Sequence, residues 1–272
     1  MPIQPSDTKQ IEKPRLNSLN NIRIVLCQTS HPGNIGAAAR AMKTMGITNL
    51  VLVSPDKFPH AESNALACGA VDLLENATVC STLEEALVGC AVAIGLSARK
   101  RNLSHELLSV REAAKQTAVI AQNQPVALVF GTEMSGLSNA ELDLCQLLAM
   151  IPTNPDFSSL NVAAAVQVVC YELRMAALEA ESASILSIVT PEQPLATSDD
   201  VEGFYAHLEE TLIKIGFLNP NEPKKLMQRV RRIYARARLE KEEVNILRGI
   251  LKHTQAPRKE QLLEAKNKIE SV

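Results

Sequence analysis

Phe130-Gly-Thr-Glu-Met-Ser-Gly-Leu-Ser-Asn139 is a stretch of small and polar residues that directly follows the apolar run 125–130. A second stretch, Ile151-Pro-Thr-Asn-Pro-Asp-Phe-Ser-Ser-Leu-Asn161, follows the apolar run 147–151 in the same way. Loops that follow the strands of a parallel sheet meet at its carboxyl edge, where such proteins build their binding sites. The two stretches therefore predict an α/β fold with a site made of strand-to-helix loops.

The other apolar runs support a parallel sheet, because they are continuous rather than alternating, as in strands that are buried on both faces. They predict strands at 22–27, 49–53, 91–96, 126–130 and 147–151, and a weaker one at 77–80. Helical patterns lie between them at 35–45, 82–88, 106–122, 138–146 and 159–181. This alternation predicts a mostly parallel sheet that is covered by helices.

The chain beyond residue 158 divides into three parts. The helical pattern 159–181 is apolar nearly all round at its beginning, so it must be buried in the core or in a subunit interface, and we favour a dimer contact. A change to Ser, Thr and Pro at 183–200 is typical of a linker. Helical patterns at 201–216, 222–238 and 241–253 predict a small all-helical domain. The expected organisation is a disordered tail at 1–20, an α/β domain at 21–182, the linker at 183–200, a helical domain at 201–254 and a C-terminal tail at 255–272.

The net charge of the 272-residue chain is only −2, but one segment is strongly basic. Residues 222–238 contain seven basic side chains and one acidic side chain, a local net charge of +6. On a helical wheel one face of this segment is formed by Lys225, Arg229, Arg232 and Arg236. A packing seam about 100° away is formed by Leu226, Val230, Ile233 and Ala237. A basic face without acids favours contact with nucleic acid, and a solvated helix surface is the alternative.

Composition excludes several other classes of protein. Aromatic residues make up 3% of the chain and Trp is absent, so RNA contacts are expected to be mostly electrostatic rather than an aromatic platform. The six cysteines are scattered, which is typical of reduced thiols in a cytosolic protein rather than of disulfides or a zinc site. The first 20 residues lack the apolar core of a signal peptide, and no apolar run reaches the length of a membrane span. We expect a cytoplasmic protein with no metal and no membrane partner.

The loop that begins at Gly131 resembles a phosphate-binding loop but lacks its key residue. Gly131 and Gly136 have the required spacing, yet Leu137 stands where that motif has a Lys, and Glu133 adds a carboxylate that would repel a triphosphate. The turn Gly33-Asn-Ile-Gly36 likewise fails the dinucleotide-binding pattern. A neutral or cationic ligand such as S-adenosylmethionine fits better. The alternative is that both glycines only shape a turn and Glu133 caps a helix.

Further polar residues stand at the expected ends of helices and strands. Asn34 is placed to cap helix 35–45, and Ser158 or Ser159 to cap helix 159–181 and leave N–H groups for a ligand. Arg40 is flanked by alanines, so its guanidinium has room to reach a phosphate or ligand, with a surface salt bridge as the alternative. Arg99, in Arg99-Lys-Arg101, places positive charge at the carboxyl edge of the sheet, where a solvated turn is the alternative.

Three motifs together carry a family resemblance. They are Gln28-Thr-Ser-His-Pro-Gly-Asn-Ile-Gly-Ala-Ala-Ala-Arg40-Ala-Met-Lys-Thr-Met-Gly46, the Phe-Gly-Thr-Glu loop and Asn154-Pro-Asp-Phe-Ser-Ser-Leu-Asn161. In order and spacing they resemble the motifs of SpoU-type RNA 2′-O-methyltransferases of the SPOUT class. The likeness covers residues 21–254. Within the class, the chain resembles the tRNA (cytidine/uridine-2′-O)-methyltransferases. This closer resemblance extends through Gly203-Phe-Tyr-Ala-His-Leu-Glu-Glu-Thr-Leu212 and Leu239-Glu-Lys-Glu-Glu-Val-Asn-Ile-Leu-Arg-Gly-Ile-Leu251.

The resemblance implies a fold and an activity. The fold is a parallel-sheet SPOUT domain with a C-terminal trefoil knot, followed by the helical domain, which would bind tRNA. S-adenosylmethionine would be held in the knot loops, and two subunits of a homodimer would complete each site. The reaction would be methylation of the ribose 2′-hydroxyl of cytidine or uridine 32 in the tRNA anticodon loop.

The resemblance also implies site residues. The cofactor would be contacted by Leu96, Ser97, Ala98, Gly131, Ile151, Ser158, Ser159 and Leu160. The reacting ribose and methyl group would be surrounded by Asn34, Arg40, Glu133, Ser159 and Asn161. The tRNA would be contacted by Arg99, Lys225, Arg229, Arg232 and Arg236.

In descriptions of the class, the residue equivalent to Arg40 often serves as the general base. A guanidinium with a pKa above about 12 rarely gives up its proton. We therefore expect Arg40 to position the ribose and to stabilise the developing alkoxide. The competing interpretations are methylation of another RNA, a non-catalytic RNA-binding protein of the same fold, and a phosphate-binding α/β protein, against which the missing Lys speaks.

Overall fold

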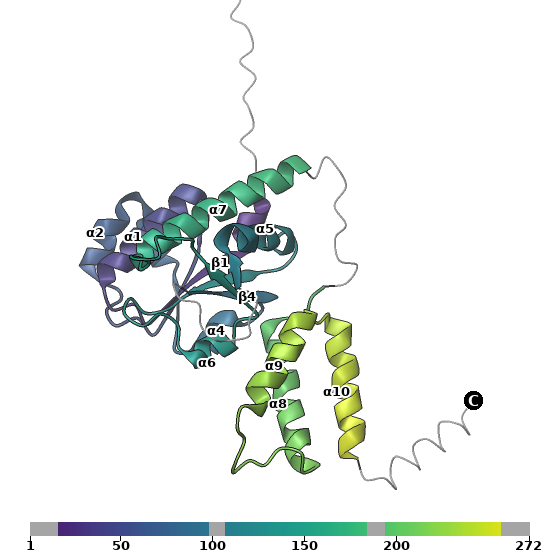
Figure 1. Cartoon of the computed structure of the whole chain (residues 1–272). Coiled ribbons are helices and arrows are strands. Elements are labelled where there is room, and N and C mark those ends of the chain that lie inside the picture. The colour runs from purple at the N-terminus through teal and green to yellow at the C-terminus, as the bar shows by residue number, and fades with distance from the viewer. Residues whose placement is uncertain (1–15, 98–106, 184–193, 257–272) are drawn as a thin grey trace, which may run out of the picture.

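The computed structural model describes residues 16–97, 107–183 and 194–256 (Figure 1). One seven-stranded sheet with the order β3-β2-β1-β6-β4-β7-β5 forms its centre, and every described strand pair is parallel. The strands are β1 (Ile22–Cys27), β2 (Asn49–Val53), β3 (Thr78–Cys80), β4 (Val92–Leu96), β5 (Leu107–Ser109), β6 (Val126–Phe130) and β7 (Leu147–Met150). The predicted parallel α/β sheet is confirmed.

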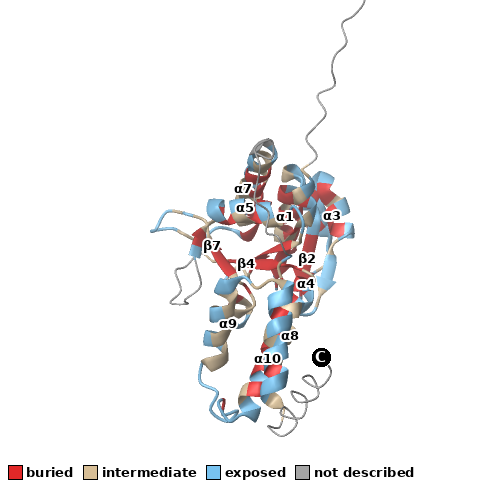
Figure 2. Ribbon diagram, turned by 90° about the vertical axis from the view of Figure 1, so that its right-hand side faces the viewer, coloured by how far each residue is buried: buried red, intermediate tan, exposed pale blue. Residues whose placement is uncertain are grey.

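Helices cover both faces of the sheet. Figure 1 shows α1, α5 and α7 on one face and α4 and α6 on the other. The α/β domain contains η1 (Asn17–Asn21), α1 (Pro32–Met45), α2 (Ala61–Ala67), η2 (Cys68–Ala70), α3 (Val71–Glu75), α4 (Leu83–Leu87), α5 (Val110–Ile120), α6 (Asn139–Asp143) and α7 (Val162–Ala183). Successive side chains of β1 alternate between the two cores, because Ile24 and Leu26 belong to one apolar cluster and Val25 and Cys27 to the other. Figure 2 shows β2, β4 and β7 as buried.

Strand β5 lies where the sequence predicted the start of a helix at 106. Leu107, Leu108 and Ser109 instead pair with β7 as a short parallel strand at the end of the sheet. The helix starts at Val110, because the Ser109 hydroxyl accepts a hydrogen bond from the Glu112 N–H and the Glu112 carboxylate accepts one from the Ser109 N–H. The sequence pattern merged the strand with the helix that follows it.

Residues 61–75 form three short helices that the sequence analysis did not predict. The first of them, α2, packs very closely on α1. A Cβ added to Gly36 would lie 2.0 Å from the Ser63 carbonyl oxygen, and the Ser63 hydroxyl donates to the Pro32 carbonyl at 2.8 Å. Gly36 of the first motif therefore allows the close packing of these two helices.

Two predicted boundaries of the α/β domain differ from the structure. Helix α1 begins at Pro32 rather than at residue 35, since Pro is well suited to the first turn of a helix. The predicted disordered tail at 1–20 extends too far along the chain. Helix η1 occupies Asn17–Asn21, and its Leu19 side chain is buried in the core.

The helical domain consists of α8 (Ser198–Lys214), α9 (Leu226–Ala237) and α10 (Lys241–Gln255). Helix α8 begins inside the predicted linker 183–200, because Thr197 and Asp200 form a capping box. The three helices surround an apolar cluster that includes Phe204, Tyr205 and Val244. The predicted all-helical C-terminal region is confirmed.

The helical domain docks on the amino edge of the sheet. The Gly89 N–H donates to the Asp199 carboxylate at 3.0 Å, and the Ser198 N–H donates to the Cys90 carbonyl at 2.7 Å. The Gln124 side chain exchanges two hydrogen bonds with the Leu195 backbone. Because Gly89 and Cys90 precede β4 and Gln124 precedes β6, this domain lies opposite the predicted site.

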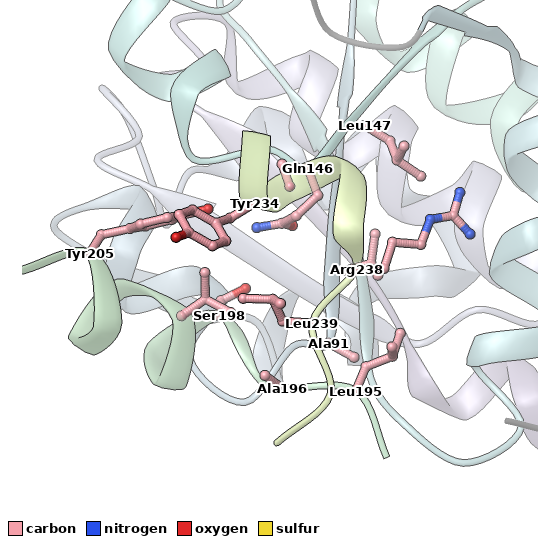
Figure 3. A pocket seen from close by; sticks show the side chains of 13 residues that line it. Ala91, Gln146, Leu147, Leu195, Ala196, Ser198, Tyr205, Tyr234, Arg238 and Leu239 are labelled. Atoms are coloured by element: carbon pink, nitrogen blue, oxygen red, sulfur yellow. The ribbon is translucent and has the colours of Figure 1, made fainter. Parts of the chain in front are cut away.

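A small cavity of about 30 Å³ lies between the two domains (Figure 3). Its walls are mostly apolar, with Tyr205, Tyr234 and Gln146 contributing polar groups. The Ser198 hydroxyl, which also lines it, is buried without a hydrogen-bond partner. The cavity belongs to the domain interface and does not contact the motif loops.

Candidate active site

A larger cavity, of about 190 Å³, lies at the carboxyl edge of the sheet. It is formed by the loops that follow β4, β6 and β7 and by the start of α7. Seven of the residues predicted to contact the cofactor line it, namely Leu96, Ser97, Gly131, Ile151, Ser158, Ser159 and Leu160. Ala98 and Arg99 lie outside the described residues. The structure thus brings together every described member of the predicted set, and their role as cofactor ligands stays a prediction.

The loop after β6 is a closed turn that only Gly131 allows. A Cβ at this position would lie 2.2 Å from both the Gly136 carbonyl carbon and the Leu137 nitrogen. The Gly136 N–H closes the turn by donating to the Thr132 carbonyl at 3.0 Å. The two glycines therefore shape a turn, as the alternative interpretation of this loop proposed, and the same turn forms one wall of the cavity.

Glu133 joins the three motif loops through hydrogen bonds. Its carboxylate accepts from the Ser30 N–H at 3.3 Å, the Ser30 hydroxyl at 3.2 Å, the His31 N–H at 3.3 Å and the Asn34 side-chain amide at 3.0 Å. The Asn34 side-chain oxygen in turn accepts from the Asn161 amide at 2.9 Å. We call this chain of contacts the motif network. It fixes both amide groups, since each already has a defined partner.

The motif network keeps Glu133 ionised. Burial raises the pKa of the Glu133 carboxyl and is the largest single influence on it, but the hydrogen bonds from Asn34 and from backbone N–H groups together outweigh it. The net pKa is lower than usual. Glu133 does not cap the helix that follows it, because Ser138 and Glu141 form the capping box of α6.

Asn161, rather than Ser158 or Ser159, caps the long helix α7. Its side-chain oxygen accepts from the N–H groups of Ala163 at 2.9 Å and Ala164 at 3.4 Å. The helix therefore begins at Val162 instead of residue 159. The prediction failed because Ser and Asn are both good capping residues and the sequence places them side by side.

Two residues of the first motif have roles that the sequence did not indicate. Asn34 lies within α1 and contacts Glu133 and Asn161, so it is not the cap of that helix. Ser30, which the sequence analysis did not single out, donates twice to Glu133. The signal for Ser30 was its place two residues before Pro32, which opens α1.

Arg40 is exposed and does not line the cavity of its own chain. Arg40 lies in the second half of α1, and one nitrogen of its guanidinium donates to the Cys68 sulfur at 3.5 Å. Of the five residues predicted around the reacting ribose, Asn34, Glu133 and Asn161 form the motif network and Ser159 lines the cavity. Arg40 is the one that the single chain leaves apart.

The basic face of α9 is present, but the predicted packing seam is rotated. Lys225, Arg229 and Arg236 are exposed and Arg232 is half-buried. Ile233 and Ala237 are exposed rather than packed, whereas Val230 and Tyr234 contact the core of the helical domain.

Arg231 explains the rotation of the seam. One of its guanidinium nitrogens donates to the Glu202 carboxylate at 2.7 Å, and the guanidinium lies 4.5 Å from the centre of the Tyr205 ring. With its guanidinium held in this way, the aliphatic part of the Arg231 side chain can pack on the helical domain as an apolar side chain would. Its charge is balanced by Glu202 and is not part of the exposed basic face.

Three further features of the described segments concern membrane spans, metal ligands and cysteines. None of their helices is long and apolar enough to cross a membrane. The same segments contain no cluster of three or more His, Cys, Asp or Glu side chains that could hold a metal ion. All six cysteines carry free thiols.

The parallel sheet, its carboxyl-edge cavity and the network between three motif loops define a SpoU-type methyltransferase. Sequence comparison agrees, because the SpoU rRNA Methylase family model matches residues 21–171. A second family model, described as the C-terminal domain of the tRNA methyltransferase TrmJ, matches residues 199–266. The chain belongs to the SpoU methylase family and, within it, to the TrmJ tRNA 2′-O-methyltransferases.

Relatives and a solved structure resemble nearly the whole chain. The tRNA (cytidine/uridine/adenosine-2′-O-)-methyltransferase TrmJ of Pseudomonas aeruginosa (strain UCBPP-PA14) is 53% identical over 248 residues, which cover 87% of this chain and 95% of that protein. The tRNA (cytidine/uridine-2′-O-)-methyltransferase TrmJ of Escherichia coli (strain K12) is 50% identical over 233 residues, 86% of this chain and 94% of that protein. The crystal structure of TrmJ from Z. mobilis ZM4 has a TM-score of 0.75 and 30% identity, and the match covers 86% of this chain and 99% of that chain. The predicted enzyme class is confirmed, and the trefoil knot stays a prediction.

Proposed function

We propose that the protein uses S-adenosylmethionine to methylate the ribose 2′-hydroxyl of cytidine or uridine 32 in the tRNA anticodon loop. The observation that carries the proposal is the motif network, which ties the first motif to the two motif loops that line the cavity. The lining of the cavity supports this choice of cofactor. Leu96, Ile151 and Leu160 offer apolar contacts to an adenine, and the ionised Glu133 suits a nearby cation. Leu137, in place of a Lys, disfavours a triphosphate.

Bound S-adenosylmethionine would supply an electrophilic methyl group, and the residues of the chain would prepare the ribose. A ribose hydroxyl is a poor nucleophile near neutral pH, so the site must stabilise the charge that develops on its oxygen. Arg40 carries a permanent positive charge and five donors, which suit it to hold a neighbouring phosphate and stabilise the alkoxide. The motif network keeps Asn161 and the start of α7 in place beside the cavity.

The proposal includes a homodimer in which Arg40 enters the cavity of the partner subunit. Two observations support it. Arg40 lies outside the cavity of its own chain. Helix α7, which packs along α1 and α5, has a half-buried to exposed apolar stripe with the spacing of a dimeric coiled-coil seam. The stripe consists of Ala164, Val168, Tyr171 and Met175, with Tyr171 48% and Met175 37% exposed. A second copy would cover it.

We also propose that the enzyme works in the cytoplasm on tRNA. Its free thiols, four of them buried with a pKa that burial raises, suit a reducing compartment. The basic face of α9 supplies the positive charge that phosphate groups require.

The direct test is methyl transfer to an unmodified tRNA transcript. Purified protein is incubated with methyl-labelled S-adenosylmethionine, and the product is mapped by mass spectrometry. We expect one 2′-O-methylated pyrimidine, at position 32, and none in a matched tRNA with a 2′-deoxynucleotide there. Modification at another position would contradict the proposed substrate. Cofactor binding without any transfer would favour a non-catalytic RNA-binding protein.

The basic face can be tested by charge reversal. Arg229→Glu combined with Arg236→Glu should weaken tRNA binding more than tenfold at about 0.1 M salt and lower the slope of log affinity against log salt by about two, because two phosphate contacts are lost. Both side chains are exposed, so the fold should survive. S-adenosylhomocysteine affinity should not change.

A matched control introduces the same change in net charge at two positions outside the basic face. Lys214→Glu with Lys252→Glu alters two exposed lysines on α8 and α10. This variant should retain most of the tRNA affinity and most of the salt slope. Equal losses in both double variants would show that net charge, rather than the basic face, governs binding.

A further inference from the structure

The two most exposed large apolar side chains of the described residues belong to the loops that build the cavity. Met134 is 96% exposed and lines the cavity, and Phe157 is 81% exposed and directly precedes the lining residue Ser158. The next in exposure, Phe217 at 67%, lies between α8 and α9 in the other domain. An aromatic side chain with this exposure at the rim of a site is a candidate for contact with a ligand.

The backbone around Phe157 is held by defined hydrogen bonds. The Asp156 N–H donates to the Asn154 side-chain oxygen at 3.0 Å, and the Phe157 N–H donates to the Asn154 carbonyl at 3.1 Å. The Thr153 hydroxyl donates to the Ser158 carbonyl at 3.2 Å and closes the same turn. Such a turn fixes the backbone locally. Phe157 therefore projects outward because of the fold of the loop.

The substrate must bring a base to this rim. The ribose that is methylated has to approach the cavity mouth, and its base is attached to the neighbouring ribose carbon. The base must then lie beside one of the loops that border the cavity, and Phe157 stands on one of them. Exposed aromatic rings bind splayed-out RNA bases by stacking.

We propose that Phe157 stacks on the base of the nucleotide whose 2′-hydroxyl is methylated. This inference rests on the proposed function and adds a specificity contact to it. Stacking accepts any base, because every base has a flat π face, and it therefore suits an enzyme that accepts both cytidine and uridine. The Asn154 side-chain oxygen, an amide acceptor on this loop, already accepts from the Asp156 N–H within the turn. The base is thus held by its face rather than recognised by its edge.

The test compares a normal substrate with one that lacks the base. A tRNA that carries an abasic ribose with an intact 2′-hydroxyl at position 32 is assayed beside the cytidine form. With the wild-type enzyme, removal of the base should lower kcat/KM roughly 5- to 150-fold. Phe157→Leu should show a loss of similar size with the cytidine tRNA, and removal of the base should then cost it almost nothing more.

Matched variants separate stacking from other effects. Phe157→Tyr keeps an aromatic ring and should retain near wild-type kcat/KM. Phe217→Leu, the same substitution at an exposed position of the helical domain, should have little effect. S-adenosylhomocysteine affinity and the oligomeric state should be unchanged in Phe157→Leu.

Each other outcome overturns the inference. If Phe157→Leu loses the same factor with the abasic tRNA as with the cytidine tRNA, the base is not its partner. If Phe157→Leu dissociates the dimer, Phe157 contacts the second subunit instead. Failure of the wild-type enzyme to methylate any tRNA would overturn the proposed function itself and this inference with it.

Discussion

Gly131→Ala is expected to abolish cofactor binding. The added Cβ would lie 2.2 Å from two backbone atoms, the Gly136 carbonyl carbon and the Leu137 nitrogen. Backbone cannot move aside as a flexible side chain can, so the turn that forms one wall of the cavity must open. We expect the Kd of S-adenosylhomocysteine, measured by calorimetry, to rise more than a hundredfold and methyl transfer to be lost.

Two other glycines provide the controls for this substitution. Gly136 has a φ of +69° but open space around its Cβ position, so Gly136→Ala should cost about 1 kcal/mol of backbone strain and weaken binding only moderately. Gly69→Ala, with nothing within 4 Å of the new Cβ, should bind like the wild type. Thermal melts show whether each variant folds. A folded Gly131→Ala enzyme with normal cofactor affinity would contradict the role of this turn.

The sheet could be predicted because its strands are buried on both faces. Continuous runs such as Ile22–Cys27 and Val126–Phe130 have no other stable place than the middle of a parallel sheet. Strand β5 escaped prediction because three residues, of which only Leu108 is buried, carry too little pattern. Its existence depends on pairing with β7, which a local pattern cannot report.

The site could be predicted in its residues but not in its connections. The motifs placed Asn34, Glu133 and Asn161 near one another, yet the hydrogen bond between Asn34 and Asn161 joins positions 127 residues apart. Which amide faces which partner depends on the tertiary fold. The prediction of the packing seam of α9 failed for a related reason. Arg231 packs inward because Glu202 and Tyr205, which lie on another helix, contact its guanidinium.

Arg40→Ala is expected to lower kcat roughly a hundredfold to a thousandfold, the range found when one electrostatic stabiliser of a transition state is removed. S-adenosylhomocysteine affinity should not change, because Arg40 does not line the cavity of its own chain. Arg40→Lys should recover only part of the activity, since an ammonium lacks the planar fork of a guanidinium. Lys43→Ala, on the same exposed side of α1, removes a surface ion pair with Asp72 and should leave kcat nearly unchanged.

Mixed dimers decide whether Arg40 acts in its own subunit or in the partner's. Leu160→Arg, at a partly exposed position of the cavity wall, should block cofactor binding by placing a long charged side chain where an apolar contact to the adenine is proposed, without disturbing the core. Each variant alone should be nearly inactive. A dimer of one Arg40→Ala and one Leu160→Arg subunit, isolated with two different tags, would combine an intact cavity with an intact Arg40 from the other chain. We expect it to show about half the wild-type activity per dimer, since one of its two sites is complete. If Arg40 acted within its own chain, neither subunit of the mixed dimer would hold a complete site, and the activity would stay at the level of the inactive parents.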